Sequence, residues 1–153
     1  FDLYALLRIL TQWRYRGSLR MRRHDDGEWE TVDGNFLMLY CCNVPWLLPD
    51  VQMAPHARFD DGAADALIVQ SASRFEMLSE FLDLSSGRHA SAPWIRYVKC
   101  SELELTPEPR AAAHPGYIAL DGEEWPLVKT RVQVLPSRIT LLGVRGATDT
   151  DNV

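Results

Sequence analysis

The segment Gly116-Tyr-Ile-Ala-Leu-Asp-Gly-Glu-Glu-Trp-Pro-Leu-Val-Lys-Thr-Arg-Val-Gln-Val-Leu135 contains the strongest fold signal in the chain. Residues 117–120 form a short apolar run, and the pair that follows, Asp121-Gly122, is a favoured two-residue hairpin turn. Residues 130–135 then alternate polar with apolar side chains, as a half-buried strand does. The segment therefore predicts a β-hairpin that presents Glu123 and Glu124 beside Asp121 at its tip. A solvated hairpin tip is the ordinary interpretation of such a turn.

Composition limits the size and class of the protein. The chain has 153 residues, of which 46% are hydrophobic and 24% are charged, and this suffices for one packed core. We expect one domain over residues 1–145 and a disordered polar tail over residues 146–153. The chain begins at Phe1 and shows no signal peptide, which indicates a piece of a longer protein. No apolar run is long enough to span a bilayer, so we expect any membrane contact to be peripheral.

The charge distribution argues against a nucleic-acid partner. The net charge of −5 does not supply the basic face that a phosphate backbone requires. Five arginines nevertheless fall within ten positions: Arg14, Arg16, Arg20, Arg22 and Arg23. They are either a solvated edge of a helix and strand or a contact for phosphates or anionic lipid headgroups, and the sequence leaves both interpretations open.

The three cysteines predict free thiols. Cys41 and Cys42 are adjacent, and adjacent residues of a strand face opposite sides, so these two cannot form a disulfide without distortion. Cys100 makes the number odd. Neither the cysteines nor the four histidines have the spacing of a zinc site. We therefore expect a reduced, intracellular protein.

Most of the chain reads as short strands. Alternating or apolar runs predict eight or nine of them, over residues 18–23, 28–32, 36–43, 66–69, 94–100, 102–106, 117–120, 130–135 and 138–142. The run 36–43 is apolar on both faces and predicts a central, buried strand. Asp33-Gly34 predicts a turn before it.

Two stretches have helical spacing of their apolar residues. They are residues 2–15, which end near Gly17, and residues 73–84, which end before Gly87. Hairpin connections dominate the chain, so the predicted fold class is mainly β (α+β), an antiparallel β-sandwich with two helices over an end or a face. No complete catalytic motif is present.

Two loops have more than one interpretation. In Asp60-Asp61-Gly62, adjacent carboxylates in a tight turn either hold a hard cation with neighbouring carbonyl oxygens or bond to their own backbone as turn formers. In Trp46-Leu47-Leu48, bracketed by Pro45 and Pro49, three large apolar side chains either fill the core or touch a membrane.

Several landmarks in a fixed order resemble the sphingosine kinases within the wider diacylglycerol-kinase-like lipid kinases. They span about residues 13–142: Tyr15-Arg16-Gly17, Met53-Ala54-Pro55 to Asp60-Asp61-Gly62, Phe81 to Gly87-Arg88-His89, Trp94-Ile95-Arg96-Tyr97-Val98, and Leu120-Asp121-Gly122-Glu123 ending at Leu135-Pro136. In this family a nucleotide-binding α/β half carries a Gly-Gly-Asp-Gly motif, and a C-terminal β-sandwich holds the lipid. The resemblance implies that the chain is that second half.

The resemblance also implies roles for individual positions. Glu123 matches the family's proton acceptor or acidic-network glutamate and is the expected catalytic residue, with Asp121 and Gly122 beside it near the nucleotide. Asp61 matches a turn aspartate that holds a structural Mg²⁺ in bacterial relatives, together with the carbonyls at positions matching Arg58 and Ala63. The adjacent Asp60 is an alternative metal ligand.

The lipid-binding positions fall on the second predicted helix and the loop after it. Phe81, Leu84 and His89 match positions that line the alkyl-chain pocket of sphingosine kinases. Phe75 and Leu78 belong to the same apolar stripe, which serves either as plain core or as a pocket wall. A long-chain base buries many methylenes at about 0.8 kcal/mol each, so an apolar helix over a sandwich suits it.

The function implied by the resemblance is an ATP-dependent lipid kinase that phosphorylates the primary hydroxyl of a sphingoid base, with ATP and Mg²⁺ required for transfer. It would be cytoplasmic, with peripheral membrane association. Diacylglycerol and ceramide kinases share the architecture and remain alternatives, as does a non-catalytic β-sandwich module that binds lipid or protein. We expect this chain alone to be inactive, because the glycine-rich nucleotide motif lies outside it.

Overall fold

The computed structural model describes residues 14–82, 84–109 and 117–140, without the side chains of residues 80 and 81. Eight strands lie in this part of the chain: β1 (Tyr15–Arg23), β2 (Trp29–Phe36), β3 (Met38–Cys42), β4 (Ala64–Val69), β5 (Arg96–Pro107), β6 (Tyr117–Leu120), β7 (Glu123–Pro126) and β8 (Thr130–Gln133). Between β4 and β5 lie the helix α2 (Arg74–Phe81) and two 3₁₀ turns, η1 (Leu84–Ser86) and η2 (Arg88–Ser91).

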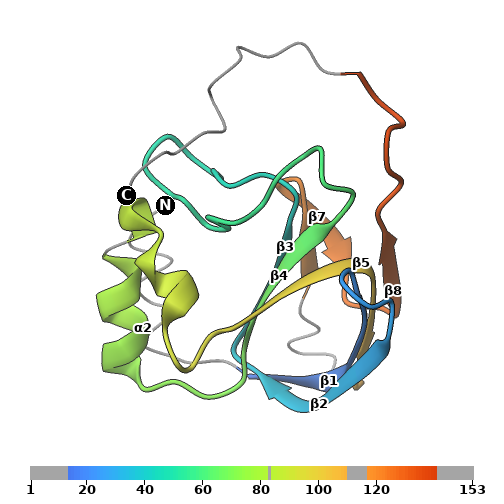
Figure 1. Ribbon diagram of the computed structural model, residues 1–153. Helices are drawn as coiled ribbons and strands as arrows, with labels where there is room; N and C mark the ends of the chain where they lie inside the picture. The colour runs from blue at the N-terminus through green and yellow to red at the C-terminus, as the bar shows by residue number, and fades with distance from the viewer. Residues whose placement is uncertain (1–13, 83, 110–116, 141–153) are drawn as a thin grey trace.

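Six of these strands form one antiparallel sheet. Its order is β2-β1-β5-β4-β3, and β8 pairs with β5 outside this path. The strands β6 and β7 form a separate two-stranded hairpin. Figure 1 shows α2 on one side of the molecule and β8 on the opposite side. The predicted fold class, a mainly β protein of antiparallel sandwich type, is confirmed.

The long strand β5 connects the two parts of the sheet. Residues 96–100 pair with β4, residues 100–107 pair with β1, and residues 102–105 also pair with β8. The register with β1 shifts by one residue at Ser101, which therefore forms a bulge. Because a bulge adds one residue to the alternation, Cys100 and Leu103 face the same core. The sequence predicted two separate strands here, because the bulge changes the phase of the alternation within one continuous strand.

The core forms on both faces of β4. All six residues of this strand are buried, so β4, which lies between β5 and the edge strand β3, is the strand with both faces covered. Its even-numbered residues pack into one apolar layer and the odd-numbered Leu67 and Val69 into another, as the period of two requires. The buried members of the first layer include Leu19, Met21, Ile68, Cys100 and Leu103. Those of the second layer are Ala54, Ala57, Leu67, Val69 and Ile95.

The prediction of a central strand over residues 36–43 was wrong. Phe36 ends β2, and β3 is an edge strand whose residues are half-buried or exposed. Its apolar character on both faces has another cause: Leu39 packs against the first layer, while Met38 and Tyr40 pack against the second. The predicted Asp33-Gly34 turn was also wrong, because both residues lie inside β2.

The helical predictions were correct in part. The helix expected over residues 2–15 falls almost entirely outside the described residues, and Tyr15 is the first residue of β1 rather than helical. The second helix ends at Phe81 instead of Leu84, where a 3₁₀ turn takes over. Gly87 adopts the left-handed conformation (φ 69°) just after that turn, as a helix-stopping glycine does.

Two predictions concern the C-terminal end. Residues 138–140 of the strand expected over 138–142 are not in a strand, and the last two positions lie outside the described residues. The expected tail over residues 146–153 lies outside them as well.

Candidate functional site

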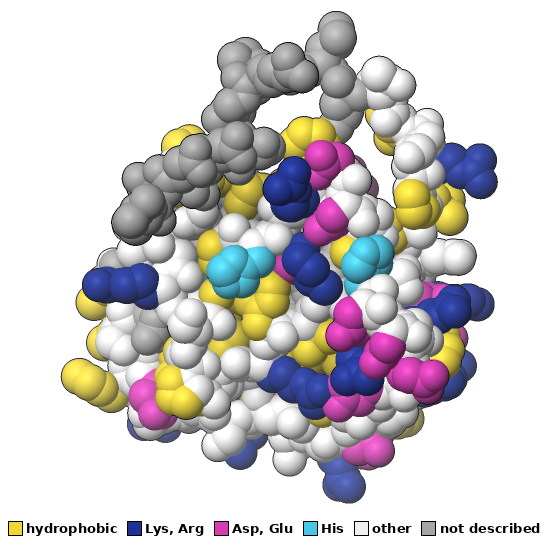
Figure 2. Space-filling model, viewed as in Figure 1, with side chains coloured by type: hydrophobic (Ala, Val, Ile, Leu, Met, Phe, Trp, Pro, Cys, Tyr) yellow, Lys and Arg dark blue, Asp and Glu magenta, His cyan; other side chains and the backbone are white. Residues whose placement is uncertain are grey.

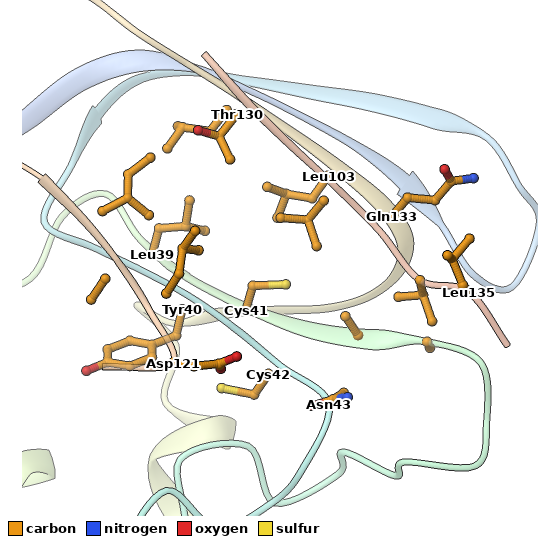
Figure 3. Close-up of a pocket in the computed structure, with 18 of the residues that line it drawn as sticks. Leu39, Tyr40, Cys41, Cys42, Asn43, Leu103, Asp121, Thr130, Gln133 and Leu135 are labelled. Carbon is orange, nitrogen blue, oxygen red and sulfur yellow. The ribbon is translucent and has the colours of Figure 1, made fainter. Parts of the chain in front are cut away.

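A large apolar cavity lies between the main sheet and the β6–β7 hairpin. Its volume is about 1130 Å³, at the upper end of the range for ligand-binding cavities. Its wall includes aliphatic and aromatic side chains from β3, β5, β6 and β8, together with residues of the loops around 59–63 and 134–139. Figure 3 shows Leu39 and Cys41 of β3 and Leu103 of β5 projecting into this space. The cavity therefore offers an apolar interior bounded by backbone that is fixed in strands.

The alternation of side chains along β5 and β8 produces this wall. Leu103 is opposite Val132 in the register, and both line the cavity. The neighbouring position pairs Glu104 with Arg131, which faces away from the cavity and approaches Glu104 at 3.9 Å. Because a strand alternates its faces, one pairing register sets both the apolar wall and the charged exterior.

The turn predicted at Asp121-Gly122 is confirmed, but the strand that pairs with β6 is β7, whereas residues 130–133 pair with β5. Asp121 (φ 49°) and Gly122 (φ 89°) both have positive φ, as the tight turn between Leu120 and Glu123 requires. Asp121 lines the cavity, and in the view of Figure 3 it lies toward Tyr40 and Cys42 of β3. The acidic turn therefore lies at the edge of the apolar space.

The two glutamates after the turn face opposite sides of β7. Glu123 pairs with Leu120, and Glu124 pairs with Ala119. Both are exposed, and within the described part of the chain no hydrogen bond or ion pair joins the side chain of Glu123 to another residue. A carboxylate in this position is able to accept a proton or approach a cation, and Glu123 therefore stays the predicted catalytic residue.

The predicted Mg²⁺ turn has a different arrangement. Asp61 Oδ1 accepts a hydrogen bond from the backbone N–H of Ala63 (3.0 Å), and its Oδ2 accepts one from Lys99 Nζ (2.7 Å). Asp60 turns instead to Arg58, whose Nε donates to Asp60 Oδ1 at 3.2 Å. Ala63 thus directs its N–H, a donor, at Asp61. Within the described ranges no three acidic, histidine or cysteine side chains could share a metal ion, and both oxygens of Asp61 already accept hydrogen bonds. The Mg²⁺ site, which relies on backbone carbonyls as well, stays a prediction.

Lys99 also binds Asp65, which is completely buried. Lys99 Nζ lies 2.9 Å from Asp65 Oδ2. Burial alone would lower the pKa of Lys99, but hydrogen bonds to the two carboxylates outweigh it and raise that pKa. Burial alone would likewise raise the pKa of Asp61, but the Lys99 ammonium and the Ala63 N–H hold it below its usual value. The three side chains form one unit of interacting charges.

Four of the five predicted lipid-binding residues have described side chains, and these four do not line the large cavity. Phe75 is 79% exposed, Leu78 and Leu84 are half-buried, and the side chain of Phe81 is outside the described part. His89 is buried, and its Nε2–H donates to the carbonyl of Met53 (2.9 Å), so it ties η2 to the loop before β4. Their role in lipid binding stays a prediction.

The arginines of β1 have partners on the sheet surface. Arg16 pairs with Glu108 at 3.2 Å, and Arg20 pairs with Glu104 at 3.1 Å. Arg22 donates to the carbonyl of Gly27, and Arg23 pairs with Asp26. Figure 2 shows acidic and basic side chains mixed on the visible face rather than separated. Because these arginines already have partners, the contacts favour the interpretation as a solvated strand surface and not the one as a phosphate-binding patch.

The loop that contains Trp46-Leu47-Leu48 exposes its apolar side chains. The three are 43%, 49% and 42% exposed, although backbone hydrogen bonds hold the loop, as between Leu47 N and Val51 O (2.9 Å). The interpretation as core filling is therefore wrong for this loop. Among the described helices, none has the length and apolar character to span a bilayer.

All three cysteines are free, as predicted. Cys42 packs against the second apolar layer, whereas the thiol of Cys41 interacts with that of Cys100 in the first layer. This opposite orientation confirms why Cys41 and Cys42 do not pair. Burial and the neighbouring Cys41 and Asp65 raise the pKa of Cys42 to about 11.

The described residues define a mainly antiparallel β domain of sandwich type with an apolar cavity and an acidic turn at its edge. Residues 3–143 match the family described as the YegS C-terminal NAD kinase beta sandwich-like domain. The chain belongs to this family.

Curated relatives with similar sequences include sphingoid kinases. The chain is 35% identical over 114 residues to sphingoid long chain base kinase 4 of Schizosaccharomyces pombe, an alignment that covers 73% of this chain and 24% of the relative. It is 34% identical over 119 residues to sphingosine kinase 2 of Homo sapiens, covering 75% and 17%. The chain thus spans a quarter or less of the length of these relatives.

Solved structures show the same fold at lower identity. A diacylglycerol kinase from Bacillus anthracis str. Sterne aligns with a TM-score of 0.51 and 13% identity, over 84% of this chain and 43% of that one. Another chain from the same organism aligns with a TM-score of 0.56 and 19% identity, over 85% and 42%. At these identities the similarity supports the fold alone.

Two features of the site were missed in the sequence. The cavity wall on β3 and β5 was interpreted only as core, although the alternation at Leu103 and Leu105 is visible in the sequence. Lys99 was not recognised as the partner of Asp61, because the two are 38 positions apart and no local pattern connects them. The cross-strand pairing of Asp65 with Lys99 is a property of the sheet register.

Proposed function

We propose that the chain is the lipid-binding half of an ATP-dependent lipid kinase and completes its active site with Glu123. The alkyl chain of the lipid occupies the apolar cavity, and its hydroxyl group lies toward the Asp121-Gly122 turn. A separate nucleotide-binding part of the protein supplies MgATP to this edge. The single observation that carries the proposal is the position of Asp121, which lines the apolar cavity while its neighbour Glu123 is exposed beyond the turn.

The chemistry of phosphoryl transfer supports this arrangement. The reaction needs positioning, neutralisation of phosphate charge by Mg²⁺ and a carboxylate near the attacking hydroxyl. Asp121, Glu123 and Glu124 supply carboxylates within and next to one tight turn. The strand pairing of β6 with β7 fixes the backbone that carries them, so a lipid held by its alkyl chain has its polar end close to these acids.

The hydrophobic effect supports a long alkyl chain as the occupant. Each methylene removed from water contributes about 0.8 kcal/mol, and the cavity wall has several aliphatic side chains able to contact it, among them Leu39, Leu105 and Val132. We infer a sphingoid base as the substrate, because curated relatives with similar sequences include kinases named for sphingosine and sphingoid bases. The product would be the corresponding 1-phosphate.

A second candidate substrate is diacylglycerol, because a solved structure with this fold is that of a diacylglycerol kinase. Among the described residues, Asp60 and Asp121 are the acidic ones that line the cavity, and Arg138 is the basic one. Arg58 already pairs with Asp60, so Asp121 is the carboxylate that favours a lipid carrying an amine over a neutral one. Competition of sphingosine with diacylglycerol and with ceramide for the cavity distinguishes these candidates. Binding of sphingosine that resists both competitors supports a sphingoid substrate, and displacement by diacylglycerol favours the alternative.

The experiment that tests the cavity as the lipid site compares two substitutions. Leu39→Trp fills the cavity from β3, whereas Leu78→Ala truncates a half-buried side chain of α2 that does not line it. We expect Leu39→Trp to weaken binding of a fluorescent long-chain amine at least tenfold and Leu78→Ala to leave it nearly unchanged. The opposite result would move the lipid site to α2, where the sequence first placed it.

We also propose that the loop with Trp46, Leu47 and Leu48 gives the protein a peripheral contact with membranes, from which a cytoplasmic kinase would take its lipid. Exposed large apolar side chains on a loop held by its own hydrogen bonds support this. The double substitution Trp46→Ala and Leu47→Ala should reduce co-sedimentation with liposomes. Unchanged sedimentation would remove this loop from the proposal.

A further inference from the structure

The side chain of Lys99 places a positive charge at the turn from Arg58 to Ala63. Lys99 Nζ lies 2.7 Å from Asp61 Oδ2 and 2.9 Å from Asp65 Oδ2. One ammonium thus bridges a carboxylate of the turn and a carboxylate of the buried strand β4. A divalent cation that coordinated Asp61 through this oxygen would have to displace the ammonium.

The position of Lys99 is fixed by the sheet. Lys99 and Asp65 are directly opposite in the pairing of β5 with β4, and the carbonyl of Lys99 accepts a hydrogen bond from the backbone N–H of His24 (3.0 Å). The side chain therefore starts from a rigid backbone position and reaches over the strand to Asp61. A cross-strand pair of opposite charge is a stabilising arrangement in antiparallel sheets.

The burial of Asp65 shows why a cation is needed here. Its side chain is 0% exposed, and an ionised carboxylate without a partner in such a place is strongly unfavourable. The other bond of Asp61, from the N–H of Ala63, uses its second oxygen. Both oxygens of Asp61 then have hydrogen-bond donors with no additional ion.

The turn also packs on Pro136: a Cβ added to Gly62 would lie 3.3 Å from the Cγ of Pro136.

We propose that Lys99 is the permanent counter-ion of Asp61 and Asp65 and takes the place of a bound divalent cation at this turn. The turn residues Phe59, Gly62 and Ala63 line the apolar cavity, so the ammonium also holds one part of the cavity wall. The stability of this domain is therefore independent of divalent cations.

The test measures the thermal unfolding midpoint in EDTA and in excess Mg²⁺ or Ca²⁺. Lys99→Met removes the charge and keeps a long apolar side chain. Lys129→Met is the matched control, since Lys99 and Lys129 are the two lysines of the chain and Lys129 is exposed. Lys99→Arg keeps the charge with a different geometry.

We expect the unmodified chain and Lys129→Met to unfold at the same temperature in EDTA and in Mg²⁺. Lys99→Met should unfold on the order of 6–12 °C lower in EDTA, because it leaves a buried carboxylate unpaired. Added Mg²⁺ or Ca²⁺ should recover part of that loss, and Lys99→Arg should lose less than Lys99→Met.

Two results would overturn the proposal. One is an unmodified chain whose midpoint rises with Mg²⁺ and falls with EDTA, with the response abolished by Asp61→Asn, since the turn would then hold a metal ion. The other is a Lys99→Met variant as stable as Lys129→Met, since the ammonium would then not be needed as a counter-ion.

Discussion

Glu123 and Glu124 are adjacent residues of β7 and face opposite sides of it, because successive side chains of a strand alternate between its two faces. This difference between two single residues provides a matched pair for testing the catalytic role. Both side chains are exposed, so neither substitution should affect the fold.

We predict that Glu123→Gln in the full-length protein lowers kcat by about 10²- to 10⁴-fold, the usual contribution of a general base. Lipid affinity should be unchanged, because the alkyl chain binds elsewhere in the cavity. Glu124→Gln should retain most of the activity. Steady-state kinetics with a sphingoid base, together with a direct binding measurement, separates the two effects. If both variants lost the same factor in kcat, the effect would come from the overall negative charge of the turn and not from Glu123 itself.

Cys42 is a second residue with a testable property, the pH dependence of its thiol. Burial is the main cause that raises its pKa to about 11, and Cys41 and Asp65 add to it. Because the pKa is raised in the folded state, the protonated thiol stabilises the fold fully below the ordinary pKa of 9.0, and this contribution is lost as the pH rises through about 11.

We therefore expect native Cys42 to react with iodoacetamide about 100-fold more slowly at pH 8 than the same cysteine in urea-unfolded chain, since raising the pKa from 9.0 to about 11 lowers the thiolate fraction by that factor. The rate should rise steeply up to about pH 11. Peptide mass spectrometry in a Cys41→Ser background assigns the label to Cys42. A native midpoint at or below that of the unfolded chain would contradict this prediction.

Among the strands, the pairing of β1 with β5 depends on Gly17. A Cβ added here would lie 2.7 Å from the carbonyl oxygen of Thr106 and 3.1 Å from Cα of Pro107. Both atoms belong to the backbone of β5 and cannot rotate away. The close approach of β5 thus explains why glycine occupies position 17 of the Tyr15-Arg16-Gly17 stretch. The sequence alone did not provide this explanation.

We predict that Gly17→Ala destabilises the domain by about 1–3 kcal/mol, the range for overpacking a fixed site. Ser18→Ala is the control on the same strand and should change the free energy of unfolding by no more than about 0.5 kcal/mol. Urea denaturation monitored by tryptophan fluorescence gives both values. A Gly17→Ala variant as stable as the control would mean that β1 shifts away from β5 at little cost.

Considered as one body, the chain has a lipid-sized cavity and an acidic turn but no nucleotide-binding motif in its sequence. It spans 24% and 17% of two kinases to which it is similar. The proposed function therefore requires a second part of the protein that binds the nucleotide.

We predict that the isolated chain does not phosphorylate sphingosine in the presence of MgATP, although it binds a long-chain amine. Transfer of labelled phosphate, measured beside the binding assay on the same preparation, checks both statements. The full-length protein is the positive control. Phosphorylation by the isolated chain above the blank would show that it binds ATP by itself.

The features that could be predicted from the amino-acid sequence depend on short-range chemistry. The Asp121-Gly122 turn was predictable because both of its positions require positive φ, which aspartate and glycine tolerate. The antiparallel class followed from closely spaced alternating runs, and the free cysteines followed from their odd number and adjacency.

The contacts across the sheet could be learned from the folded molecule alone. An apolar run on both faces describes the edge strand β3 as well as the fully buried strand β4, so the pattern did not distinguish an edge strand from an interior one. The bulge at Ser101 and the Lys99 bridge arise from strand register. Such contacts join residues tens of positions apart, and their energy depends on burial and pairing, which a linear pattern does not contain.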